Sequence, residues 1–299
     1  MLLKKSGGYE SRDPFVLYEN GRWYHLYTVG AEALYLSAAD KPDGLLEAPG
    51  VCVFTPEAGT PYSCELWAPE LHVLNGKCYI YVACDDGDNY HHRMYVLTND
   101  SAAPQAPYRM LGKLSDASDK WAIDATLFSH RGQLYAVWSG WEGDENVCQD
   151  LYIAKMSDPC TVFSERVKIS TPEYEWEKMD CDGVSLPFIN EGPCVYEKEG
   201  VLRILYSASG SWANNYCIGI LTLTGDDPMR ADAWVKQPYP ALSQADGFNG
   251  PGHCSVISDG MRDYIAFHVY DDGARKGWDH VHAVLSPFTI VNGKIVLEE

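Results

Sequence analysis

Hydrophobic and polar residues alternate in short runs along the chain, and the same arrangement of runs occurs five times. Each copy has an alternating run of strand length, a turn centred on glycine, and a second run rich in tyrosine. Because the side chains of a strand point alternately to its two faces, this period of two predicts β-strands, and each glycine turn predicts a β-hairpin. The copies are DPFVLYENGRWYHLYT from Asp13, WAPELHVLNGKCYIYVA from Trp67, DATLFSHRGQLYAVWSG from Asp124, EGPCVYEKEGVLRILYSASG from Glu191 and PGHCSVISDGMRDYIAFHVY from Pro251.

The hairpins recur at a nearly constant interval. Their turn glycines are 55, 56, 68 and 60 residues apart, at Gly21, Gly76, Gly132, Gly200 and Gly260. A further alternating strand follows each hairpin, usually with another short run after it, so each copy holds the antiparallel strands of one β-propeller blade. We therefore expect an all-β fold, a five-bladed β-propeller, in which residues 1–299 form a single catalytic domain.

The composition limits the class of ligand. The chain has 20 Tyr and 9 Trp, and aromatic faces pack well on the C–H faces of sugar rings. Its net charge of −19 argues against nucleic acid, which requires clustered Lys and Arg. No apolar run reaches the roughly 18 residues of a membrane-spanning helix. We expect a neutral carbohydrate partner, and neither a nucleic acid nor a membrane.

The N-terminal sequence and the cysteines bear on the cellular compartment. The sequence MLLKKSGGYESRDPF lacks the apolar segment of a signal peptide. The ten cysteines occur without a CxxC pair, which argues against a zinc site or a redox motif. Free thiols in a chain without a leader sequence predict a cytoplasmic location.

Three carboxylates occupy matched positions in the repeats. Asp13 and Asp124 lie eight residues before the turn glycines of their copies, Glu191 lies nine and His253 seven. These positions begin the innermost strand of a blade, so the side chains should converge at one mouth of the central channel. Glycoside hydrolysis needs one protonated and one ionised carboxyl group, and a third can keep their pKa values apart. The alternative is that these residues only cap turns.

The motifs resemble a known family. SRDPF, WAPELHVLNGKCYIYVA, WAIDATLF, VWSGWEGDENVCQDLYIAKMSDP, INEGP and GPGH, in this order, are similar to glycoside hydrolase family 43. Within it the chain is most similar to the α-L-arabinofuranosidases, including those of the exo-1,5 type, and the resemblance runs from Arg12 to about His268. It implies release of terminal L-arabinofuranose from arabinan or arabino-oligosaccharides by an inverting mechanism.

The resemblance also implies individual roles. Asp13 in RDP would be the general base, and Glu191 in NEGP would be the general acid. Asp124 would orient Glu191 and raise its pKa. Residues that would border the substrate are Trp67, Glu70 and Phe15.

The family often holds a Ca²⁺ or similar ion in the central channel through the histidine of GPGH, which makes His253 a candidate ligand. The chemistry itself would need no cofactor. Two positions depart from close relatives: Cys254 stands where GPGHN has Asn, and His282 in DHVHAV stands where an HTRAQ-like segment has Arg. His91 and His92 are expected in an exposed loop of a blade.

Two other functions remain open from the sequence. A β-xylosidase of the same family would use the same carboxylates, because the two sugars present similar hydroxyl arrangements. A non-catalytic sugar-binding propeller would share the fold. The set of three carboxylates argues against the second alternative, because binding alone does not require it.

Overall fold

The computed structural model describes residues 3–4, 8–99, 101–271 and 280–298, and these residues form an all-β fold. The helices among them are single 3-10 turns, none of them long and apolar enough to cross a membrane. They are Tyr9–Ser11, Leu45–Glu47, Asn89–His91, Glu175–Glu177, Ala231–Ala233 and Gln244–Asp246. The prediction of an all-β fold is confirmed.

Two antiparallel sheets come from the first part of the chain, each with its strands in sequence order. The first consists of β2 (Phe15–Glu19), β3 (Arg22–Val29), β4 (Ala33–Ala39) and β5 (Gly50–Phe54). The second consists of β6 (Cys64–Leu74), β7 (Lys77–Asp85), β8 (Arg93–Thr98) and β9 (Arg109–Leu114).

A larger sheet joins two antiparallel groups through a short parallel pairing of β12 with β17. The first group is β10 (Ala122–His130), β11 (Gln133–Gly140) and β12 (Cys148–Asp158), edged by β13 (Thr161–Val162) and β14 (Val167–Ser170). The second group is β17 (Phe188–Lys198), β18 (Val201–Ala208), β19 (Cys217–Leu223) and β20 (Trp234–Lys236). A small hairpin that the repeat pattern did not predict, β15 (Met179–Asp180) and β16 (Gly183–Val184), precedes β17.

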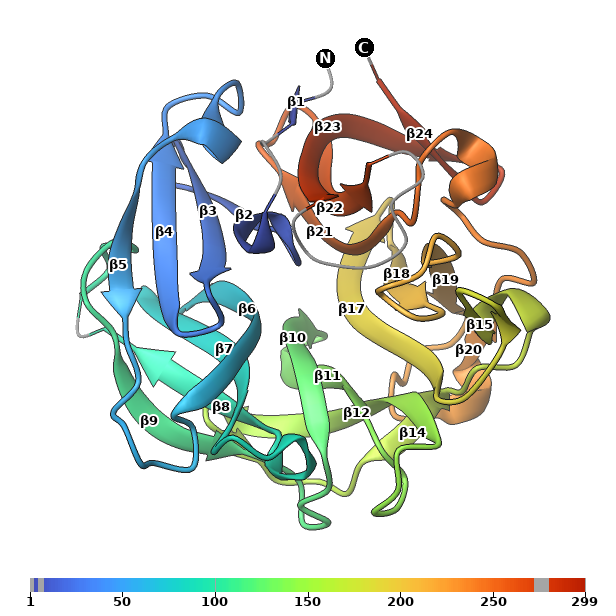
Figure 1. Ribbon diagram of the computed structural model, residues 1–299, viewed down its shortest axis with the longest axis horizontal. Helices are drawn as coiled ribbons and strands as arrows, with labels where there is room; N and C mark the ends of the chain where they lie inside the picture. The colour runs from blue at the N-terminus through green and yellow to red at the C-terminus, as the bar shows by residue number, and fades with distance from the viewer. Residues whose placement is uncertain (1–2, 5–7, 100, 272–279, 299) are drawn as a thin grey trace.

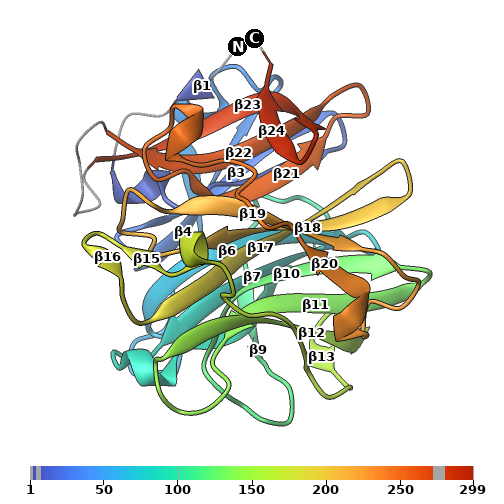
Figure 2. The ribbon, with the colours of Figure 1, turned by 90° about the vertical axis from the view of Figure 1, so that its right-hand side faces the viewer.

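The last sheet contains both ends of the chain. It is built from β21 (Gly252–Ser258), β22 (Asp263–Tyr270), β23 (Val281–Val291) and β24 (Lys294–Leu297). The N-terminal β1 (Leu3–Lys4) pairs with β23. Figures 1 and 2 show the two termini at the same edge of the molecule.

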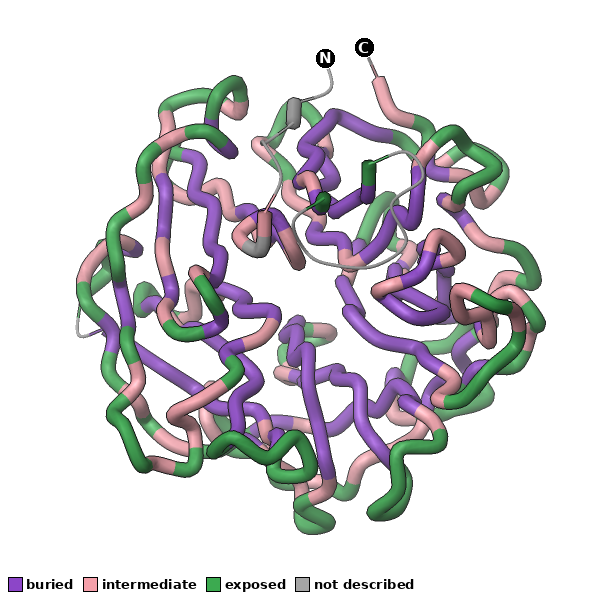
Figure 3. The backbone as a smooth tube through the Cα atoms, in the orientation of Figure 1, coloured by how far each residue is buried: buried purple, intermediate pink, exposed green. Residues whose placement is uncertain are grey.

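The sheets are arranged around a central region, with β6, β10, β17 and β21 nearest to it (Figure 1). Figure 3 shows that these inner strands are mostly buried, whereas exposed residues gather on the outer loops. Each sheet is covered on both faces by its neighbours. In β7, Ile80 and Val82 pack with Leu34 of the first sheet, while Tyr81 faces Trp138 of β11.

The five predicted hairpins are confirmed at their glycines: β2–β3, β6–β7, β10–β11, β17–β18 and β21–β22. In the first of them, Asn20 (φ 52°) and Gly21 (φ 79°) both have positive φ. Two successive positive φ angles make a type I′ turn, whose twist matches that of the paired strands. The local sequence therefore determines the strand pairs on which the pocket is built.

Candidate active site

The inner strands share a backbone irregularity where they approach the centre. Pairing slips between Ile123 and Thr126 in β10, between Glu191 and Cys194 in β17, and in β6 and β21 at the same level. A β-bulge of this kind redirects a side chain out of the strand's regular alternation. At the slips, and just before β2, residues with positive φ are Asp13 (46°), Ala68 (43°), Asp124 (59°), Gly192 (52°) and His253 (47°), and β6 has a second one at Glu65 (50°).

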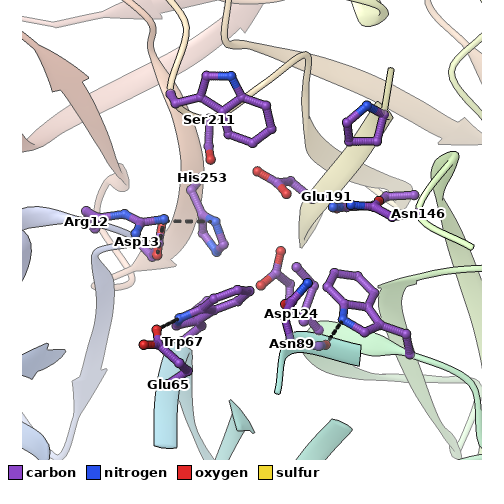
Figure 4. A pocket seen from close by; sticks show the side chains of 16 residues that line it. Arg12, Asp13, Glu65, Trp67, Asn89, Asp124, Asn146, Glu191, Ser211 and His253 are labelled. Carbon is purple, nitrogen blue, oxygen red and sulfur yellow. Dashed lines mark hydrogen bonds and ion pairs between the residues drawn. The ribbon is translucent and has the colours of Figure 1, made fainter. Parts of the chain in front are cut away.

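These irregular positions open into one pocket of about 270 Å³. Its lining includes the three carboxylates selected from the sequence, Asp13, Asp124 and Glu191. Figure 4 shows Asp13 and Glu191 on opposite sides, with His253 between them. The remaining lining is largely aromatic and polar, including Arg12, Trp67, Trp121, Asn146, Gln149, Ser211 and Trp212.

Asp13 lies between cationic groups. His253 Nδ1 is 3.2 Å from one carboxylate oxygen, and Arg12 Nη2 is 3.8 Å from the other. Burial alone would raise the pKa of Asp13, but the charges of His253 and Arg12 outweigh it and hold that pKa well below its usual value. Asp13 is therefore ionised across the ordinary pH range.

The two histidines beside Asp13 differ in charge. The backbone N–H of Asp13 lies 3.2 Å from Nδ1 of His268, and the same nitrogen is 3.4 Å from the Asp13 carboxylate. Burial lowers the pKa of His268, which keeps the ring neutral. Burial also acts to lower the pKa of His253, but the carboxylates of Asp13, Asp124 and Glu191 outweigh it and raise that pKa.

Glu191 lies in the opposite environment. Its side chain is buried, and burial together with the charge of Asp124 raises its pKa to about 8. His253 and a hydrogen bond from Tyr216 oppose this rise without cancelling it. The Tyr216 hydroxyl donates to Oε1 at 2.8 Å. Glu191 therefore holds a proton at neutral pH.

Asp124 is tied to the strand that carries Glu191. Its Oδ2 accepts the backbone N–H of Gly192 at 2.9 Å, a bond that favours the carboxylate form. Burial and the charge of Asp13 raise the pKa of Asp124 above its usual value, although His253 and this N–H oppose the rise. A Cβ at position 192 would lie 3.2 Å from the His253 ring, so only glycine lets these groups approach one another. Asp124 is placed to raise the pKa of Glu191 and to order its backbone.

The Trp67 side chain forms part of the pocket wall. Its indole N–H donates to Glu65 at 2.9 Å, and its ring stacks on His92 with the centroids 4.0 Å apart. His92 is held by Asp85 at 2.8 Å and is fully buried, which corrects the expectation of an exposed loop. The adjacent histidines of the HHR motif differ in burial, since His91 is exposed and His92 is not.

Glu70 and Phe15 lie beside the pocket and not on its wall. They line a second cavity of about 10 Å³ together with His253 and Cys254. Glu70 Oε2 is 2.7 Å from His72 Nε2, and the His72 ring lies 5.8 Å from the Phe15 ring. Of the substrate-binding residues selected from the sequence, Trp67 alone lines the larger pocket.

The residues around His253 do not fit a calcium site. Ca²⁺ takes roughly six to eight oxygen ligands, whereas His253 presents Nδ1 to Asp13. Within the described ranges, no group of three or more His, Cys, Asp and Glu side chains could hold a metal ion. The cavity beside His253 has room for about one water molecule. We derive no catalytic step through an ion.

The second departure from close relatives lies away from the carboxylates. His282 Nε2 is 2.6 Å from Asp271, and His282 is not among the residues that line the pocket. Sequence reasoning missed Arg12, His268 and Tyr216. Arg12 stands in the RDP motif itself, whereas Tyr216 lies just before β19, outside the repeated hairpins.

The arrangement suits transfer of two protons across one small ligand. An ionised carboxylate on one side can accept a proton from water, and a protonated carboxyl group on the other can donate one. The aromatic wall offers an apolar face for the ligand.

Comparison with known proteins gives relatives over most of the chain. An extracellular exo-α-(1→5)-L-arabinofuranosidase of Streptomyces avermitilis is 32% identical over 86% of this chain, and one of Streptomyces chartreusis is 30% identical over 86%. The chain spans about half of the first relative (54%) and 79% of the second. The crystal structure of an α-L-arabinofuranosidase from Lactobacillus brevis matches with a TM-score of 0.85 at 28% identity, covering 95% of this chain and 93% of that one.

These relatives correct the predicted location. The cytoplasmic prediction is wrong, because both Streptomyces proteins are named extracellular, which points to secretion. The free cysteines were a poor guide to the compartment. Cys84 and Cys217 are buried, and burial raises the pKa of each thiol, so neither forms the reactive thiolate. Unpaired buried thiols of this kind do not require a reducing compartment.

The family assignment follows from the greater part of the chain. The model of glycosyl hydrolases family 43 matches residues 53–295, which include Asp124, Glu191 and His253. The motifs WAPE, DAT and EGP that suggested this resemblance lie within the matched residues, whereas RDP lies before them. The chain belongs to glycosyl hydrolases family 43.

Proposed function

We propose that this chain releases terminal L-arabinofuranose from arabinan or arabino-oligosaccharides with inversion at the anomeric carbon. The observation that carries the proposal is the opposite protonation of two carboxyl groups facing one pocket. The pKa of Asp13 is held low, and that of Glu191 is raised to about 8. Hydrolysis of a glycosidic bond requires this pair of states.

Each group has one task in the proposed reaction. Asp13 accepts a proton from water as the water oxygen bonds to the anomeric carbon. Glu191 gives its proton to the glycosidic oxygen, which leaves with the electron pair of the broken C–O bond. Asp124 keeps Glu191 protonated until that step. Inversion requires the acid and base carboxyls to stand about 6.5–9.5 Å apart, so that water fits between base and sugar. Asp13 takes up one proton and Glu191 gives up the other, so the proposed chemistry needs no cofactor.

The fold supports one catalytic unit. We propose a five-bladed β-propeller of a single domain, with the two antiparallel groups of the larger sheet counted as separate blades. Five repeated hairpins and the separate core cluster between each pair of neighbouring sheets support this count. The active site would lie where the inner strands of these blades meet.

The substrate class follows from the relatives and from the pocket. The Streptomyces and Lactobacillus proteins carry arabinofuranosidase names. The pocket volume of about 270 Å³ is at the small end for ligand sites, which suits one terminal sugar. Trp67 would offer its ring to the C–H face of that sugar. An arabinose-containing carbohydrate is the proposed partner.

The test compares two chromogenic sugars. The protein should hydrolyse 4-nitrophenyl α-L-arabinofuranoside at least about tenfold faster than 4-nitrophenyl β-D-xylopyranoside, measured as kcat/KM. NMR of the first product should show the inverted anomer. Turnover of the xyloside alone would identify a β-xylosidase, release of long fragments from linear arabinan would identify an endo-enzyme, and binding without turnover would leave only a sugar-binding role.

A further inference from the structure

Tyr216 lies outside the repeated hairpins, yet its hydroxyl reaches the carboxyl group of Glu191. The distance from Oη to Oε1 is 2.8 Å, and the Tyr216 side chain is fully buried. We propose that Tyr216 is a positioning residue, which fixes Oε1 of Glu191 and leaves the transferable proton on Oε2. The inference rests on the proposed role of Glu191 as the general acid.

The neighbours of Tyr216 set the direction of this hydrogen bond. The backbone N–H of His253 donates to Ser207 Oγ at 2.6 Å. The Ser207 hydroxyl also bonds with Tyr216. Since Ser207 already accepts from a backbone N–H, its own hydrogen is available for the phenolic oxygen. Tyr216 then directs its single hydrogen to Oε1 of Glu191, and burial raises the pKa of the phenol far above its usual value. Oε1 is thereby an acceptor, and the proton of Glu191 resides on Oε2.

The phenol ring is held in place on more than one side. It lies nearly parallel to the His268 ring, with an interplanar angle of 13° and centroids 5.4 Å apart. A Cβ at Gly252 would lie 2.0 Å from Tyr216 Cε1, so glycine is required for this close approach. The backbone N–H of Tyr216 donates to Ala213 at 3.1 Å. The position of the hydroxyl is therefore fixed, and its hydrogen bond restricts the carboxyl group of Glu191 to one orientation.

The same hydroxyl acts during proton transfer. Glu191 gives the proton on Oε2 to the glycosidic oxygen, and the electron pair of that O–H bond stays on the carboxylate. The electron pair of the broken C–O bond stays on the glycosidic oxygen of the leaving group. Negative charge then grows on Glu191, and the Tyr216 O–H already points at it. Without the Tyr216 hydroxyl, Glu191 is a weaker acid and its carboxyl group is held less firmly in the orientation for proton transfer. The substrate keeps its own contacts, so kcat should change more than KM.

Tyr216→Phe tests the proposal because it removes only the hydroxyl. On a linear arabino-oligosaccharide, whose sugar leaving group requires a proton, we expect kcat to fall about 10- to 100-fold with KM within about twofold. The alkaline limb of kcat/KM should move up by about one pH unit, because the donor stabilises the ionised form of Glu191 and lowers its pKa.

A tyrosine elsewhere in the fold provides a matched control. Tyr206 is also fully buried and donates to a buried carboxylate, Glu177 Oε1, at 2.9 Å. It is packed equally closely, since a Cβ at Gly219 would lie 2.5 Å from its Cζ. Tyr206→Phe should lower Tm by a similar amount to Tyr216→Phe while leaving the pH profile in place. A shared loss of activity and stability in both variants would indicate a structural role only.

A titration without substrate separates this inference from the proposed function. In protein labelled with ¹³C at the glutamate carboxyl carbon, the resonance missing from Glu191→Gln reports the Glu191 pKa. Its midpoint should lie near pH 8 in the wild type, and about one pH unit higher in Tyr216→Phe. Ser207 lies one hydrogen bond further from Glu191, so Ser207→Ala should raise the Glu191 midpoint by less than Tyr216→Phe does. This variant replaces Tyr216→Phe in the test if Tyr216→Phe does not fold. An unchanged or lowered midpoint overturns the proposal, whichever sugar the enzyme accepts.

Discussion

On one side of the pocket Asp13 lies between two cationic groups, whereas on the other Glu191 lies against a carboxylate and a phenol. Both are carboxyl groups at the centre of the same fold, and burial acts on both in the same direction. The charges of His253 and Arg12 reverse that effect at Asp13, while Asp124 adds to it at Glu191. The comparison teaches that the neighbours, and not the depth of burial, decide which carboxyl group is ionised and which is protonated.

The largest effects should come from neutralising either carboxyl group. Glu191→Gln and Asp13→Asn should each lower kcat/KM on an arabino-oligosaccharide by about 10³-fold, within the usual range for general acid–base groups. The two variants should differ on 4-nitrophenyl α-L-arabinofuranoside, because nitrophenolate leaves without a proton. Glu191→Gln should then recover much of its rate, while Asp13→Asn should not.

Circular dichroism should show both variants folded. Equal losses on the two substrates would mean that Glu191 does not protonate the leaving group, and the assignment of the two sides would fail.

Removing the charge of Asp124 should make the two sides more alike. Asp124→Asn keeps an oxygen that can accept the Gly192 N–H, but it no longer raises the pKa of Glu191. The alkaline limb of kcat/KM should therefore move to lower pH, and activity at neutral pH should fall about 10- to 100-fold. A pH–rate profile measures this. An alkaline limb at the wild-type position would show that Asp124 acts on orientation alone.

The smallest effect should come from the cationic side. His253→Gln removes a positive charge 3.2 Å from Asp13, so the pKa of Asp13 should rise. Since the base must be ionised, the acidic limb of kcat/KM should move to higher pH, with about a tenfold loss at pH 5. His91→Gln is a control, because His91 pairs with Asp86 in an exposed site. If both histidine variants keep the wild-type acidic limb, Arg12 and His268 hold Asp13 ionised without the charge of His253.

The sequence predicted the hairpins and the positions of the three carboxylates because those features depend on local pattern. Asp13 and Asp124 lie eight residues before their turn glycines and both have positive φ, Asp13 just before β2 and Asp124 within β10. Glu191 lies nine residues before its glycine because Gly192 takes the equivalent backbone position in β17. Counting back from the turn glycine finds the carboxylates at both distances, because the turn fixes the register of the two strands in the hairpin.

Contacts across the fold carried no such signal. Tyr216 bonds a residue 25 positions earlier, and His268 meets an Asp13 backbone amide 255 positions away. Tyr216 lies outside the repeated hairpins, and the fifth repeat marks His268 as a strand residue without showing that it lies next to Asp13. The neutral state of His268 and the burial of His92 depend on which rings pack around them, which alternating hydrophobicity does not encode.

The bulge in β6 has a consequence for engineering. Ala68 occupies the backbone position that holds Asp124 in β10, and it lines the same pocket with only a methyl group. Asn, Asp and His adopt left-handed backbone angles more readily than Ala. A polar side chain at position 68 would therefore add one more polar group to the wall of the pocket, and the backbone of β6 would not have to change.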